Sequence, residues 1–134
     1  MSTIIPVTCA IIIHNSQILC TQRSEKMAHP GKWEFPGGKI EQGESPETCI
    51  LREIKEELDI EIRILKAIPN VKHAYQESRI IELIPFICSY TSGAIKLKEH
   101  QQYIWLPVER LGELDWAVAD LPIVAYLNAQ LRQL

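Results

Sequence analysis

The chain has 134 residues, of which 46% are hydrophobic and 23% are charged, as expected for one globular domain spanning residues 1–134. Its net charge of -3 gives no basic field, which excludes binding of a nucleic-acid polymer through its phosphates. The most apolar stretch, residues 4–13, is too short to cross a membrane and has no Lys or Arg before it. We therefore expect a cytoplasmic protein with no membrane partner.

Strand patterns come first along the chain. Residues 4–14 and 17–22 are rich in β-branched side chains around Asn15-Ser16, which predicts two strands joined by a turn. Residues 24–32 are polar and are expected to form a loop. An extended segment should follow from Trp33 into a glycine turn at Gly37-Gly38.

A helix is predicted to begin at Ser45-Pro46 and to run to about Leu58. Ser45 suits the N-cap, and Pro46 suits the first helical position, where no N–H is needed. Residues at helical spacing predict one buried face, formed by Glu47, Ile50, Leu51, Ile54 and Leu58.

The rest of the chain completes the predicted fold. Further strands are expected at 60–68, 79–90 and 102–106, where β-branched residues recur. A last helix should open at Asp120-Leu121-Pro122, with an apolar face formed by Ile123, Val124, Leu127 and Leu131. The pattern predicts an α+β fold in three layers, a mixed sheet with two main helices.

Acidic residues are concentrated between positions 41 and 61, where eight acids stand against only two basic residues. Within the predicted helix, Glu53, Glu56 and Glu57 are spaced i, i+3 and i+4 and share one face. Clustered carboxylates repel one another unless water or a cation neutralises them, and oxygen ligands from one helix turn suit Mg²⁺. The face is either a solvated acidic surface or a magnesium site.

The surroundings of these acids resemble a known motif, G-x5-E-x7-R-E-U-x-E-E-x-G-U, in which U is an aliphatic residue. The matching residues are Gly38, Glu44, Arg52, Glu53, Ile54, Glu56, Glu57 and Ile60. This pattern is similar to the Nudix box of the Nudix hydrolases. Four further stretches resemble MutT and the bacterial CTP pyrophosphohydrolases of that family: Arg23, residues 33–39, Lys98-Glu99 and residues 119–122. The resemblance implies an α/β/α sandwich.

Asp59 departs from the motif, which has glycine there. The position follows the last helical turn, where a left-handed backbone is wanted. Asp tolerates that conformation better than most residues, at a cost of about 1 kcal/mol or less relative to Gly. Because the family has no ligand here, we expect a left-handed Asp59 and a small loss of stability.

The resemblance implies a Mg²⁺ site, with Mn²⁺ as an alternative ion. Its ligands would be Glu53, Glu56, Glu57, Glu99 and a backbone carbonyl at Gly37 or Gly38. Arg52 and Glu44 would hold these acids by charge-assisted hydrogen bonds, and either Glu53 or Glu99 would be the catalytic base. Without the resemblance, the residues around Glu99 favour a plain polar loop; with it, the loop and the ligand interpretations stand level.

A nucleoside triphosphate is the implied substrate, cleaved to a monophosphate and pyrophosphate. Asp120 stands where MutT has a base-reading asparagine. An ionised carboxylate accepts from the N4 amino group of cytosine and repels O6 of guanine, which favours CTP, dCTP or 5-methyl-dCTP over 8-oxo-dGTP. A protonated Asp120 would donate instead, and a helix cap is the other interpretation of this residue.

Arg23, Glu34 and Phe35 complete the predicted substrate-binding set. Phe35 and Trp33 share one side of the strand, and they either stack on the base or pack in the core. Arg23 either contacts substrate or is a plain surface arginine. Two alternative functions stay open, an 8-oxo-dGTP diphosphatase like MutT and a nucleotide-sensing domain without catalysis. We expect a monomer or a homodimer.

Overall fold

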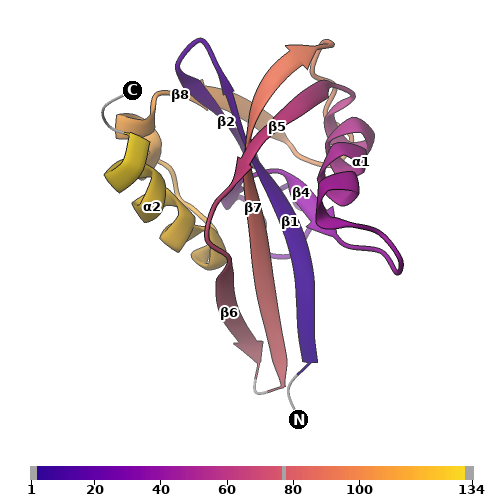
Figure 1. The fold of residues 1–134 in the computed structure, drawn as a ribbon. Coiled ribbons are helices and arrows are strands. Elements are labelled where there is room, and N and C mark those ends of the chain that lie inside the picture. Colours follow the sequence, from indigo (N-terminus) through magenta and orange to yellow (C-terminus); the bar gives the residue numbers. More distant parts are fainter. Residues whose placement is uncertain (1–2, 77, 132–134) are drawn as a thin grey trace.

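The computed structural model describes residues 3–76 and 78–131, and its centre is a pair of long strands, β1 (Thr3–His14) and β7 (Arg79–Ser92). They run parallel and side by side through the molecule (Figure 1). Both faces of β1 are covered in its middle, where Ile11 and Ile12 are fully buried. A continuous apolar run of this kind is typical of a strand that is buried on both faces.

Six further strands join this pair, all by antiparallel pairing. β2 and β4 pair with β1, β5 and β6 pair with β7, and β3 and β8 pair with β2. Their bounds are β2 (Gln17–Gln22), β3 (Trp33–Glu34), β4 (Gly37–Lys39), β5 (Glu61–Ala67), β6 (Val71–Gln76) and β8 (Gln102–Leu106). Two of these were not predicted as strands: β6, and β4, where a glycine turn was expected. The strands predicted at 4–14, 17–22, 60–68, 79–90 and 102–106 are confirmed.

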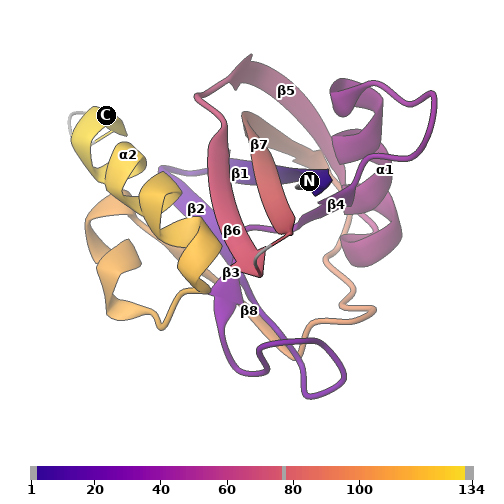
Figure 2. The same ribbon diagram turned by 90° about the horizontal axis from the view of Figure 1, so that it is seen from below.

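Two helices lie on opposite faces of the sheet, as Figures 1 and 2 show. On one face, α1 (Pro46–Leu58) covers Ala10 and Ile12; on the other, α2 (Leu121–Leu131) covers Cys9 and Ile11. Two 3₁₀ turns precede α2, η1 (Val108–Glu113) and η2 (Val118–Asp120). The mixed sheet between helices confirms the predicted α/β/α sandwich. No helix among the described residues is long and apolar enough to cross a membrane.

The start of α1 confirms the predicted cap, but its buried face differs from the prediction. The Ser45 side chain accepts a hydrogen bond from Thr48 N at 3.1 Å, and Pro46 opens the helix. Leu51 is 42% exposed, and Glu47 is also exposed, so both were wrongly placed on the buried face. The buried residues of α1 are Cys49, Ile50, Ile54 and Leu58.

The cause is a rotation of α1 about its axis relative to the predicted orientation. At 100° per residue, Cys49, Glu53 and Glu57 lie along one flank of the buried stripe. Glu53 and Glu57 are accordingly half-buried against the sheet, while Glu56 points to solvent. The acids therefore do not form one solvated face opposite the apolar residues.

Asp59 ends α1 in the left-handed conformation, with φ 58° and ψ 35°. Its N–H donates to Lys55 O at 3.0 Å, which closes the last turn of the helix. The predicted backbone at this departure from the motif is confirmed, and the chain can turn directly into β5.

Candidate active site

Arg52 lies at the centre of a cluster of carboxylates at the side of α1. Its Nε and Nη2 donate to the two oxygens of Glu44 at 2.6 and 2.9 Å, and its Nη1 donates to Glu53 at 3.0 Å and to Glu56 at 3.1 Å. The hydrogen bonds from Arg52, helped by the Glu41 amide, lower the pKa of Glu44 to about 2. Arg52 and Glu44 thus hold the predicted acids by charge-assisted hydrogen bonds, as expected.

Gly37 and Gly38 form the short strand β4 and bring backbone close to Glu53. A Cβ on Gly38 would overlap the Glu53 carboxylate, and a Cβ on Gly37 would lie 2.7 Å from Cys9 Cα. No larger residue fits either position without moving the backbone or the acid. Burial raises the pKa of Glu53, although Arg52 opposes that shift.

Glu57 is the most perturbed acid in the cluster. Burial raises its pKa to about 9, and repulsion from Glu53, Glu34 and Glu99 adds to the shift. Its Oε2 is buried and has no hydrogen-bond partner among the described residues. A buried carboxylate oxygen without a partner is costly, and a bound cation removes that cost.

Glu99 reaches this cluster from a segment far along the chain. The amides of Lys96 and Lys98 donate to Leu58 O at 2.9 Å and to Glu57 O at 3.2 Å, which fastens the segment to the end of α1. The charge of Glu99 then acts on Glu57. A pocket of about 520 Å³ opens beside them, lined by Ser24, Glu25, Lys26, Met27, Lys98 and Glu99.

The oxygen atoms of these acids are suitable ligands for a hard divalent cation. They are carboxylate oxygens, the ligand type that Mg²⁺ prefers, and the charges of Glu53, Glu34 and Glu99 all act on Glu57, whose Oε2 is unpaired. Glu56 is bound to Arg52 and must turn away from it to act as a ligand. Within residues 3–76 and 78–131, no three acidic, His or Cys side chains already converge on one point, so binding requires side-chain movement.

Glu34 of β3 lies between this acidic cluster and a second group of predicted residues. Its Oε1 accepts from Arg23 Nη1 at 2.6 Å, and its Oε2 pairs with His100 Nε2 at 2.8 Å. Arg23 also donates through Nε to Ala28 O, so it is an anchored side chain and not a plain surface arginine. His100 was not predicted, because its neighbours in the sequence are ordinary polar loop residues.

Asp120 is buried beside Glu34. Its Oδ2 accepts from Phe35 N at 2.9 Å, and among the described residues this bond replaces the expected cap of α2. Burial raises the pKa of Asp120 to about 7; Glu34 adds to the shift, whereas the Phe35 amide and Arg23 oppose it. Near neutral pH this side chain can therefore either accept or donate a hydrogen bond.

Phe35 and Trp33 both belong to the core. They are 3% and 9% exposed, and the Phe35 ring packs on Trp116 with centroids 4.6 Å apart. The core interpretation is confirmed, and the stacking role expected for the Phe35 ring finds no support. The contribution of Phe35 to the site is its backbone amide, which fixes Asp120.

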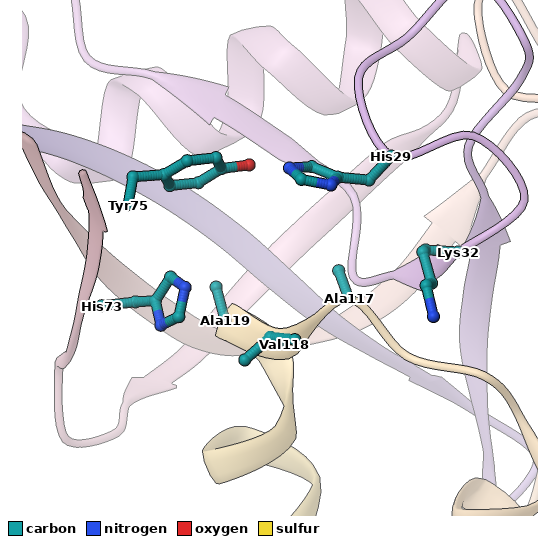
Figure 3. Close-up of a pocket in the computed structure, with 7 residues that line it drawn as sticks. All are labelled: His29, Lys32, His73, Tyr75, Ala117, Val118 and Ala119. Atoms are coloured by element: carbon teal, nitrogen blue, oxygen red, sulfur yellow. The ribbon is translucent and has the colours of Figure 1, made fainter.

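A pocket of about 190 Å³ opens beside Ala119, the residue before Asp120 (Figure 3). In its lining, the rings of His29 and Tyr75 have centroids 5.4 Å apart and planes tilted by 50°, and the His73 ring centroid lies 5.8 Å from that of Tyr75. The lining is His29, Lys32, His73, Tyr75, Ala117, Val118 and Ala119. His73 and Tyr75 were not among the predicted site residues, because strand β6, which carries both, was not predicted.

Comparison with known proteins agrees with this geometry. The profile of the NUDIX domain matches residues 5–127. The CTP pyrophosphohydrolase of Escherichia coli (strain K12) is 35% identical over 90% of this chain and 88% of its own length. The 8-oxo-dGTP diphosphatase of the same organism is 32% identical over 85% and 88%. The crystal structure of the MutT protein from Methanosarcina mazei Go1 superposes with a TM-score of 0.86 at 25% identity, over 98% of this chain and 97% of that one.

Proposed function

Since this chain belongs to the Nudix hydrolase family, we propose that it hydrolyses nucleoside triphosphates to a monophosphate and pyrophosphate with Mg²⁺, preferring CTP, dCTP or 5-methyl-dCTP. Water is added across the phosphoanhydride that joins the α- and β-phosphates, and one bond from phosphorus to the bridging oxygen breaks. The single observation that carries the proposal is the buried, unpaired carboxylate oxygen of Glu57 among three other acids. Such a group is stable as an anion only next to a cation.

On the metal side, Glu53, Glu56, Glu57 and Glu99 would hold Mg²⁺ together with a backbone carbonyl at Gly37 or Gly38. When bound there, the ion neutralises phosphate charge and lowers the pKa of a coordinated water. Arg52 and Glu44 keep Glu53 in place, and Glu53 or Glu99 takes the proton from the attacking water.

On the base side, the aromatic residues that line the pocket, His29, His73 and Tyr75, offer ring faces on which a flat base can stack. The lining ends at Ala119, next in sequence to the buried Asp120, and the charges of Glu34 and Arg23 act on Asp120. An ionised Asp120 accepts from the cytosine N4 amino group. The similarity to a CTP pyrophosphohydrolase supports this choice.

One observation favours a second candidate, an 8-oxo-dGTP diphosphatase. With its pKa near 7, Asp120 is protonated in part of the molecules at neutral pH and can then donate to a carbonyl oxygen such as O6. A relative of 32% identity carries that name. A purely nucleotide-sensing role is disfavoured because each acid of the motif is present.

A turnover screen tests the proposal. CTP, dCTP, 5-methyl-dCTP and 8-oxo-dGTP are incubated with the protein and Mg²⁺, and products are separated by ion-exchange chromatography. We expect a monophosphate and pyrophosphate, the highest kcat/KM with a cytosine nucleotide, and no turnover in Glu57→Gln. Release of single phosphate, or binding without turnover, would reject the proposed reaction. We also propose that the enzyme acts on free nucleotides in the cytoplasm as a monomer or homodimer, which light scattering will test for its oligomeric state.

A further inference from the structure

His100 occupies a buried position that the proposed chemistry does not use. We infer that His100 is a positioning residue, which fastens the segment carrying Glu99 to Glu34 and thereby sets where Glu99 stands relative to Glu57. This inference rests on the proposed metal site. It adds a residue that neither binds the ion nor touches substrate.

The His100 ring is held by one strong polar contact. Its side chain is 0% exposed, and Nε2 lies 2.8 Å from Glu34 Oε2 across 66 residues of sequence. Arg23 occupies the other oxygen of Glu34 at 2.6 Å. Because the carboxylate paired with Arg23 is an acceptor only, Nε2 of His100 carries the hydrogen and donates it.

The segment around His100 has no regular structure, although Ile95 and Leu97 pack against the core beneath α1. Residues 93–101 contain neither helix nor strand, and Lys98, Glu99 and Gln101 are all exposed. One end is tied to α1 by the amides of Lys96 and Lys98, and the other by the amide of Gln101, which donates to Gln22 O at 3.0 Å. Between these ties, His100 supplies the buried side chain next to Glu99.

The second ring nitrogen shows that the imidazole is poorly suited to a purely structural role. Nδ1 is buried and has no hydrogen-bond partner among the described residues. Leaving such an atom unpaired lowers stability, and an apolar side chain at this position would avoid the loss. A role in positioning a metal ligand explains why a histidine is present here. Substituting residues that hold metal ligands in place typically weakens metal binding.

The test compares divalent-ion binding in His100→Leu and His100→Gln with the wild type. Mn²⁺ is titrated into the nucleotide-free protein and followed by its EPR signal, so no turnover is needed. His100→Leu keeps the position apolar and removes the N–H, and we expect Mn²⁺ affinity to fall about tenfold. His100→Gln keeps an N–H donor of similar reach, and affinity should stay within about threefold of wild type.

Hydrogen exchange gives a second readout. In His100→Leu the amides of Lys96 and Lys98 should exchange about tenfold faster, because the contact with Glu34 no longer helps to hold the segment against the end of α1. Leu127→Val, on the buried face of α2 at the other side of the sheet, is the control for general loss of stability. It should change neither Mn²⁺ affinity nor these two amides. Should His100→Leu fail to fold, His100→Asn is measured instead, since its amide is too short to reach Glu34.

Wild-type Mn²⁺ affinity in His100→Leu, or no recovery in His100→Gln, would overturn the inference. If the wild-type protein itself bound no Mn²⁺, the proposed metal site would be wrong. The exchange of the Lys96 and Lys98 amides would then still decide whether His100 holds the segment, so the two failures are distinguishable.

Discussion

The guanidinium of Arg52 holds both oxygens of Glu44, with Nε to Oε2 at 2.6 Å and Nη2 to Oε1 at 2.9 Å. This two-point contact fixes the plane of the guanidinium. Nη1 is thereby directed at Glu53 and Glu56. The Arg52 guanidinium therefore orients three carboxylates, and this depends on its planar shape as much as on its charge.

Replacing Arg52 by lysine tests that geometry. Arg52→Lys keeps the charge but cannot hold Glu44 and Glu53 together, so we expect kcat/KM to fall by about 100-fold. Steady-state kinetics with the best nucleotide measure the effect. Arg110→Lys is the matched control, because Arg110 pairs with Glu113 on the exposed η1 turn and its loss should leave kcat/KM unchanged.

Gly38 should tolerate no side chain. In Gly38→Ala the new methyl group would overlap the Glu53 carboxylate and push it out of place, so turnover should fall by about 100-fold. Gly112→Ala serves as the control, because an added Cβ there meets no atom within 4 Å. Equal activity of the two variants would show that Glu53 need not stay against β4.

Glu57 should lower the stability of the metal-free protein as pH rises. Its pKa is about 9 in the folded protein and 4.5 in the reference state, so between these values the unfolded chain releases a proton that the folded protein keeps. The free energy of unfolding therefore decreases with pH across this window. Glu57→Gln should raise it by roughly 1–3 kcal/mol at pH 8 but not at pH 4.5.

Urea denaturation at both pH values, with and without Mg²⁺, measures this prediction. Mg²⁺ should stabilise the wild type at pH 8 and have little effect on Glu57→Gln. A variant that is both more stable and inactive would identify Glu57 as an acid kept for function. A variant less stable at pH 8 would contradict the burial argument.

Asp120 should make base preference depend on pH. The carboxylate form, which accepts from cytosine, dominates above its pKa of about 7, and the acid form, which donates, dominates below it. The ratio of kcat/KM for CTP to that for 8-oxo-dGTP should rise between pH 6 and pH 8. In Asp120→Asn the ratio should be about tenfold lower than wild type at pH 8 and independent of pH. An unchanged ratio would remove Asp120 from base recognition.

Asp59 offers a test of backbone strain. Asp59→Gly relieves the left-handed backbone but loses the contact of Asp59 with Lys55 at 3.3 Å, so the net gain should be about 0.5 kcal/mol. In Asp59→Ala the free energy of unfolding should fall by about 1 kcal/mol, because alanine cannot contact Lys55 and still has a strained left-handed backbone. Thermal unfolding separates the two, and both should retain wild-type kcat/KM.

Features that depend on residues close together in the sequence could be predicted. The limits of α1 follow from Ser45-Pro46 at one end and from the left-handed Asp59 at the other, and both are confirmed. Short-range capping and helical periodicity were sufficient for these limits. The Arg52–Glu44 contact was expected from the resemblance to the Nudix box.

Features that depend on distant contacts were missed. The pairing of His100 with Glu34 joins residues 66 positions apart, and nothing local distinguishes that histidine from a loop residue. The rotation of α1 buries Cys49 against the sheet, and the pattern of apolar residues in the helix does not predict this. Strand β6 is polar at Lys72 and His73 and forms because β7 supplies a partner.

The parallel pairing of β1 with β7 also bears on the order in which the chain folds during translation. Ile4 is opposite Ile80 and Ile13 is opposite Ser89, so the middle of the sheet stays incomplete until β7 has left the ribosome. Before then, the apolar run of β1 has only β2 and β4 to pair with. A nascent chain stalled before residue 79 would expose that run to chaperones, and release from them should coincide with the emergence of β7.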